Sequence, residues 1–178
     1  MENVILGLLA IRAMTVYEIN KALQKSISLF YRASFGSIHS AIDRMILNGW
    51  ILAEERIENG RNKKMYHLTP GGQEALQHWL QSEIEAEKVK DPALTRLFFM
   101  GMLPIDQRIA LLESHIQTLH QTHAILHSLQ EQSGGVKVPQ EHGDIYACQL
   151  LTLQYGLDFY SFNIAWYQNL LDDWKKKR

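Results

Sequence analysis

The chain has 178 residues, of which 46% are hydrophobic, and a formal net charge of −1 at pH 7. This apolar content is enough for one or two packed domains, so it excludes a wholly disordered chain. No run of about 18 or more apolar residues predicts a membrane span, and the single cysteine, Cys148, excludes an intramolecular disulfide framework.

The charges are distributed unevenly along the chain. Residues 1–70 hold nine Lys and Arg and six Asp and Glu, a net charge of +3, whereas residues 71–178 hold nine and thirteen, a net charge of −4. This asymmetry fits a DNA-facing N-terminal half. The apolar run from Val4 to Ile11 follows Glu2 instead of a basic cluster, which indicates a buried helix and not a signal peptide. We therefore expect a cytoplasmic protein with no membrane partner.

Two helices are expected at the N-terminal end. The first covers the apolar run from Val4 to Ile11. Thr15 and Glu18 have the spacing of a capping box and start the second helix, which is expected to reach about Lys25. Its predicted buried residues are Tyr17, Ile19 and Leu23. A looser segment from Ser26 to Arg32 follows.

The stretch from Ser34 to Ile51 predicts a short third helix. Its inward stripe recurs at i, i+3, i+4 and i+7, and consists of Ile38, Ala41, Ile42 and Met45. Gly49 is expected to end the helix in a left-handed conformation. The outward residues are predicted to bind DNA: Ser34 and Ser37 at phosphates beside the helix N-terminus, and His39, Ser40 and Arg44 at base edges or flanking phosphates. The alternative is a solvated face with ordinary caps.

A β-hairpin is expected directly after this helix. A strand from Ile51 to Ile57 is followed by Asn59-Gly60, a strong signal for a two-residue turn, and by a return strand ending at Leu68. The tip is polar and basic, and we predict backbone or minor-groove contact for Arg61, Asn62, Lys63 and Lys64. The alternative is a hairpin tip that is charged only for solubility. Three helices followed by a hairpin give the order of a winged helix-turn-helix.

The second half of the chain is predicted to be helical. Thr69-Pro70 starts a helix expected to reach about Val89, and Asp91-Pro92 starts another. We place the domain boundary there, with a DNA-binding domain at residues 1–90 and a helical dimerisation domain at 91–178. A short helix ending near Gly101 is followed by two long helices around a loop from Ser133 to Gly143.

The last helix carries an uninterrupted seam with alternating spacings of four and three, which is typical of a coiled coil. We predict that this seam forms a homodimer, through Tyr146, Leu150, Leu153, Leu157, Tyr160, Ile164, Tyr167, Leu171 and Trp174. A second apolar face could line a pocket for a planar effector or belong to the core, and consists of Tyr155, Phe159, Phe162 and Trp166. A helix that is apolar on two faces must be buried twice, once on its own subunit and once on a partner.

Three histidines lie on one side of the preceding helix: His120, His123 and His127. Such spacing can hold a metal, but no carboxylate or thiolate nearby completes a ligand set. We expect no metal, and His123 is better explained as a polar residue that sets helix register or dimer alignment. No catalytic constellation and no cofactor motif is found, so we do not expect an enzyme.

The N-terminal half resembles the PadR family of transcriptional regulators. The resemblance covers about residues 4–80 and rests on a set of short motifs: Ile5-Leu6-Gly7-Leu8-Leu9, Tyr17-Glu18-Ile19, Gly36-Ser37-Ile38 with Ala41 and Arg44, Gly49-Trp50-Ile51, Gly60-Arg61, and Tyr66-His67-Leu68-Thr69 with Gly72. The helical second half is similar in layout to the longer-tailed subgroup. Two departures are Met14-Thr15-Val16, where the family has a glycine directly before the tyrosine, and His39, where it often has tyrosine.

This resemblance implies a mainly α fold with a small β-wing, in which a winged helix-turn-helix precedes a helical dimerisation domain. It also implies a homodimeric repressor of a pseudo-palindromic double-stranded DNA operator, responsive to a small aromatic effector such as a phenolic acid. The alternative is a winged-helix adaptor that binds proteins and has lost DNA binding. The basic wing argues against that alternative, and an enzymatic role for the histidines ranks last.

Overall fold

The structure of the protein is a computed structural model, which describes residues 1–24, 35–58, 61–84 and 91–177. The chain forms two compact units, Met1–Ala86 and Glu87–Arg178. The first unit contains α1 (Glu2–Ile11), α2 (Val16–Ala22), α3 (Phe35–Leu47), β1 (Ile51–Glu58), β2 (Arg61–Leu68) and α4 (Pro70–Gln81). The second contains α5 (Pro92–Phe99), η2 (Met100–Met102), α6 (Ile105–Ser133), η3 (Gln140–His142) and α7 (Gly143–Lys176). The mainly α fold with a small β-wing is confirmed.

One hydrophobic core holds the first unit together. It joins the inner faces of α1, α2 and α3 to the base of the hairpin, and its fully buried side chains include Ile5, Leu6, Ile19, Leu23, Ile38, Ile42 and Met45. Tyr17 was predicted to be buried, but it is 69% exposed. The reason is that Ile19 and Leu23 form the inner stripe of α2 together with Val16, so the neighbouring Tyr17 points away from the core.

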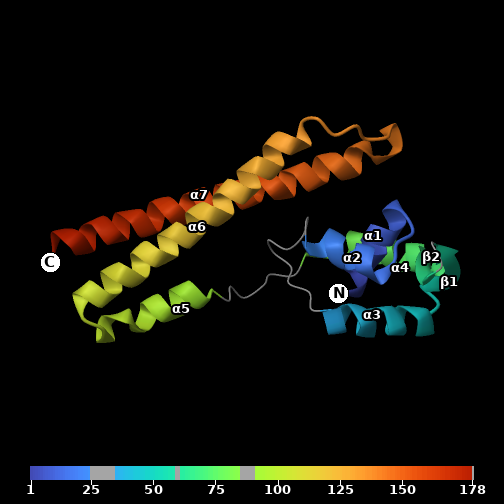
Figure 1. Cartoon of the computed structure of the whole chain (residues 1–178), viewed down its shortest axis with the longest axis horizontal. Coiled ribbons are helices and arrows are strands. Elements are labelled where there is room, and N and C mark those ends of the chain that lie inside the picture. Colours follow the sequence, from blue (N-terminus) through green and yellow to red (C-terminus); the bar gives the residue numbers. More distant parts are fainter. Residues whose placement is uncertain (25–34, 59–60, 85–90, 178) are drawn as a thin grey trace. The chain divides into compact units, whose positions relative to one another are not determined.

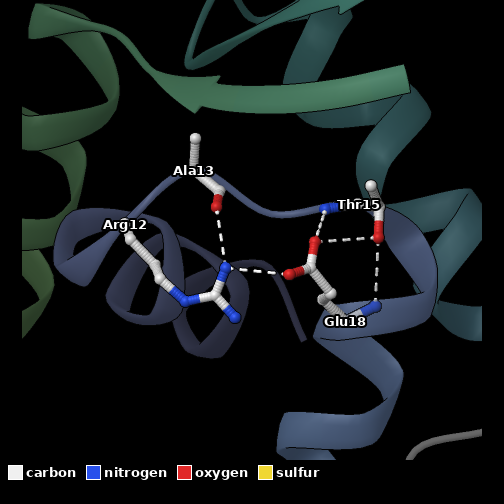
Figure 2. Close-up of polar contacts among 4 residues, drawn as sticks. All are labelled: Arg12, Ala13, Thr15 and Glu18. Atoms are coloured by element: carbon white, nitrogen blue, oxygen red, sulfur yellow. Dashed lines mark hydrogen bonds and ion pairs between the residues drawn. The ribbon is translucent and has the colours of Figure 1, made fainter. Parts of the chain in front are cut away.

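The start of α2 is fixed by the predicted capping box. The Thr15 hydroxyl accepts a hydrogen bond from the Glu18 backbone N–H at 3.2 Å, and the Glu18 carboxylate accepts one from the Thr15 backbone N–H at 2.9 Å (Figure 2). Arg12, at the end of α1, donates from Nη1 to Glu18 Oε1 at 2.9 Å and to the Ala13 carbonyl at 3.2 Å. The hydrogen bond from Thr15 and the nearby guanidinium lower the pKa of Glu18, although partial burial opposes this. These contacts stabilise the turn that connects α1 to α2.

The hairpin follows α3 after a short turn, since α3 ends at Leu47 and β1 begins at Ile51. Gly49 adopts φ +68° and the Trp50 N–H donates to the Met45 carbonyl at 2.9 Å, so α3 ends as the sequence predicted. Strands β1 and β2 pair antiparallel from Ile51 opposite Leu68 to Glu58 opposite Arg61. The turn predicted at Asn59-Gly60 lies outside the described residues and stays a prediction.

The next helix is shorter than the sequence predicted. Thr69 caps α4, with Pro70 in the first turn as expected, but α4 ends at Gln81 instead of near Val89. Ser82 takes an extended conformation and its hydroxyl donates to the Trp79 carbonyl at 2.8 Å, which removes an acceptor from the continuing helix. Leu80, in the last turn of α4, and Ile84, beyond its end, are exposed.

The second unit is a long helical hairpin. Asp91 caps α5 by accepting from the N–H groups of Ala93 and Leu94 at 2.7 and 3.0 Å. Helices α6 and α7 run side by side (Figure 1). Their shared core contains Ile109, Leu112, Ile116, Leu119, Tyr167 and Leu171. No helix in the described ranges combines the length and apolar content needed to cross a bilayer.

Candidate nucleic-acid interface

The outer face of α3 is the first part of the candidate interface. Burying Ile38, Ala41, Ile42 and Met45 against the core leaves the opposite side of the helix uncovered. His39, Ser40 and Arg44 are exposed on it, and Ser37 is half-buried. Ser34 lies outside the described residues. The packing therefore presents three predicted contact residues on one side of one helix.

Each of these side chains has a partner within the first unit. The Ser40 hydroxyl donates to the Gly36 carbonyl at 3.1 Å, which leaves its oxygen able to accept a hydrogen bond. The His39 ring meets the Phe35 ring edge-on, with centroids 4.8 Å apart. Arg44 Nε donates to Glu2 Oε1 at 2.6 Å. These contacts restrict the three side chains before any ligand binds.

Sequence reasoning missed two residues of this surface. Phe35 is 53% exposed and packs on His39, and their i, i+4 spacing could have revealed the pair. Glu2 pairs with Arg44 across 42 positions of the chain, and no local pattern indicates such a contact.

The hairpin is the second part of the candidate interface. Its basic residues are accompanied by glutamates on β1, which the basic tip alone did not indicate. Asn62, Lys63 and Lys64 are exposed, whereas the side chain of Arg61 lies outside the described residues. Lys64 Nζ lies 3.7 Å from Glu55 Oε1 on the opposite strand, which matches their register.

A second ion pair lies on β1 itself. Arg56 donates to both oxygens of Glu54, at 3.0 and 3.2 Å, and this contact lowers the pKa of Glu54. Two of the basic residues of the hairpin, Arg56 and Lys64, are therefore paired with acidic residues of β1. Charge alone therefore does not identify the wing as a DNA contact.

The predicted dimer seam needs a correction. None of its nine residues is exposed, and Leu157, Tyr167 and Leu171 are almost fully buried inside a single chain. Tyr160, Ile164 and Trp174 pack against the core shared with α6, and the Tyr146 hydroxyl donates to the Ser133 carbonyl at 2.8 Å. The seam meets α6 of its own chain because α6 carries a matching stripe at the same spacing. Leu157, Tyr167 and Leu171 are therefore not available to a partner while the hairpin is closed.

The other face of α7 is the uncovered one. Its large apolar side chains are all exposed, and we call them the α7 aromatic stripe: Leu151, Tyr155, Phe159, Phe162 and Trp166. They recur at intervals of four, four, three and four, so they lie along one side of the helix. The core alternative for these residues is therefore wrong within one chain. Neither of two open grooves on this unit, of about 780 and 370 Å³, is lined by the four residues predicted to bind an effector.

The histidines of α6 have structural contacts. His123 Nε2 lies 3.0 Å from the Ser161 hydroxyl of α7, and His127 Nδ1 lies 3.5 Å from Glu131. His120 borders the smaller groove. In the part of the chain that the structure describes, no group of three or more His, Cys, Asp or Glu side chains could hold a metal. His123 joins α6 to α7 of the same chain, so its contact is one of helix register.

Comparisons with known proteins match both units. Residues 5–78 match the model of the transcriptional regulator PadR-like family, and residues 89–174 match the C-terminal domain of virulence activator alpha. The negative transcriptional regulator PadR of Bacillus subtilis is 27% identical over 115 residues, which are 64% of this chain. The matched region spans 63% of that relative's length.

Solved structures show the same fold over nearly the whole chain. The B. subtilis PadR complex with operator DNA has a TM-score of 0.83 at 21% identity, and covers 97% of this chain and 98% of that one. The same relative's complex with p-coumaric acid has a TM-score of 0.78 at 21% identity, covering 98% and 94%.

Proposed function

Because this chain belongs to the PadR-like family of transcriptional regulators, we propose that it is a sequence-specific DNA-binding regulator acting as a homodimeric repressor. The observation that carries the proposal is α3, whose inner face is buried in the core while its outer face presents His39, Ser40 and Arg44 beside a hairpin. The relative crystallised with operator DNA supports the same ligand for this fold. Operator binding would place its site of action in the cytoplasm.

Residues 1–90 form the DNA-binding domain in this proposal. Helix α3 enters the major groove, where His39 and Ser40 read base edges. Ser34 and Ser37 bind phosphate at the start of the helix. The wing follows the backbone through the polar and basic residues of its tip, namely Arg61, Asn62, Lys63 and Lys64.

Residues 91–178 form the dimerisation domain, and the α7 aromatic stripe is the contact between subunits. A single winged helix reads few base pairs, so two must be held on half-sites about 34 Å or a multiple of it apart. Stripes of exposed aromatic side chains are typical of protein interfaces and not of free surfaces. A second copy of the chain offers the same stripe, so a two-fold axis would bury both.

A small aromatic acid is the proposed effector, since the B. subtilis relative was crystallised with p-coumaric acid. An effector of this class would bind the DNA-free form more tightly than the DNA-bound form. We expect p-coumaric acid to weaken retention of the protein's upstream DNA in a gel shift. Equal retention with and without the acid would contradict this effector.

The binding test uses the DNA upstream of the protein's own gene and a scrambled duplex, titrated at several salt concentrations. We expect Arg61→Ala with Lys63→Ala to weaken both complexes, because the two side chains contact phosphates. Each lost contact reduces the slope of log affinity against log salt by roughly 0.9, so the double variant should lose roughly 2.

The control for this variant is Lys175→Ala with Lys176→Ala, which removes the same charge from the C-terminal end of α7 and should leave the slope unchanged. An unaltered slope in the wing variant would remove the wing from the interface. Absence of binding by the wild-type protein to either duplex at low salt would contradict the proposed function itself.

A further inference from the structure

Glu2 and Arg44 form an ion pair that joins the N-terminal helix to the outer flank of α3. Glu2 lies in the first turn of α1, and its Oε1 accepts from Arg44 Nε at 2.6 Å. The Arg44 side chain is 55% exposed and that of Glu2 is 26% exposed. Pairs with this much solvent exposure contribute little to folding stability.

The geometry of the pair leaves Arg44 able to bind. A guanidinium carries five N–H groups, and the bond from Nε uses one of them. The terminal Nη atoms keep four N–H groups, which can reach a phosphate or the edge of a guanine. Among the described residues, those Nη atoms have no other hydrogen bond or ion pair. Glu2 thus holds the guanidinium at Nε, while the Arg44 side chain stays 55% exposed.

The charge of the pair also matters for DNA. An unpaired arginine on this flank would bind any phosphate within reach and release a counterion, whatever the sequence. A carboxylate held at 2.6 Å offsets this attraction, because it must itself approach the negatively charged backbone. Glu2 therefore weakens DNA binding in which Arg44 contacts only a phosphate. It still allows binding in which the Nη atoms of Arg44 meet hydrogen-bond acceptors of matching geometry.

We propose that Glu2 is a positioning residue that sets the DNA selectivity of Arg44. The proposal rests on the proposed function, since it requires that α3 faces DNA. Glu2 touches no base in this scheme: it acts by orienting Arg44 and by opposing sequence-independent binding. It adds a residue of α1 to a specificity that is otherwise assigned to α3 and the wing.

The test compares Glu2→Gln with the wild-type full-length protein on two probes, a random-sequence duplex and an operator duplex recovered by selection with the wild type. We expect Glu2→Gln to bind random DNA roughly tenfold more tightly at about 0.1 M salt, because Arg44 is then free to neutralise one phosphate. The salt slope on random DNA should steepen by roughly 0.9. The ratio of operator affinity to random-DNA affinity should fall.

Two further variants separate this scheme from a general charge effect. Glu113→Gln removes an equal charge and frees Lys175 from a 2.7 Å pair in the second unit, so it should leave the salt slope on random DNA unchanged. In an Arg44→Ala background, Glu2→Gln should no longer steepen the slope. Circular dichroism melting of each variant checks that the fold is retained.

Several outcomes would overturn the proposal. An unchanged affinity ratio and slope in Glu2→Gln would show that the pair has no part in selectivity. An equal effect in the Arg44→Ala background would show that Glu2 acts on DNA directly and not through Arg44. A wild type that binds no duplex at all would remove this proposal together with the proposed function, whereas binding without a Glu2 effect removes this proposal alone.

Discussion

Replacing Phe162 with aspartate is expected to convert the proposed dimer to a folded monomer. Phe162 is 66% exposed on the α7 aromatic stripe, so the substitution disturbs little within one chain. Covering a phenylalanine in an interface contributes about 1.5–3 kcal/mol, and a two-fold axis repeats each loss. The aspartate adds two charges that the interface would have to bury without partners.

The consequence for DNA binding should be large. Two linked winged helices gain roughly 10²–10⁴-fold in affinity over one, because the second half-site is bound intramolecularly. We expect a loss of this order for Phe162→Asp on the operator and a small change on random DNA. Sedimentation equilibrium and a gel shift on one preparation measure both effects. A dimeric Phe162→Asp protein would exclude the stripe as the subunit interface.

Leu157→Asp provides the contrast, since it lies on the other face of the same helix. Its side chain is 5% exposed, buried in its own chain, so an aspartate there should destabilise the second unit itself. A lower melting temperature is expected, and not the clean dissociation expected of Phe162→Asp. The two variants therefore distinguish packing within the chain from packing between chains.

Replacing Gly72 with alanine is expected to destabilise the winged-helix unit strongly. A Cβ at this position would lie 2.1 Å from the Trp50 carbonyl oxygen and 2.7 Å from Leu68 Cδ1. The carbonyl cannot move away without cost, because it accepts a hydrogen bond from the Thr69 N–H at 3.0 Å. Overpacking of this kind costs about 1–3 kcal/mol and at times more. A unit of this size would lose roughly 10 °C in melting temperature.

Gly71 supplies a matched control one residue earlier in the same helix turn. A Cβ there would meet nothing closer than 3.8 Å, which is ordinary contact. Alanine also reduces the conformational freedom of the unfolded chain, so Gly71→Ala should be neutral or slightly stabilising. Thermal melts followed by circular dichroism compare the two variants. Equal melting temperatures would mean that α4 can move away from the base of the wing at no cost.

The sequence alone determined where α2, α4 and α5 begin and where α3 ends. Thr15 with Glu18, Thr69-Pro70 and Asp91-Pro92 start their helices as predicted, and Gly49 ends α3 at positive φ. These signals succeed because each depends on side chains or backbone within a few residues, so no distant packing is needed to read them. The inward stripe of α3 was predictable for the same reason, since helical periodicity fixes which residues share a face.

Only the tertiary structure decided what covers each face. On α7 both the heptad seam and the aromatic stripe have helical spacing, and periodicity cannot tell which one meets α6. The seam is buried because α6 carries a complementary stripe in the same chain, which leaves the aromatic stripe exposed. Contacts such as Glu2 with Arg44, and Glu55 with Lys64, likewise join separate elements. A contact between elements depends on how the chain folds back on itself, and no local pattern records that.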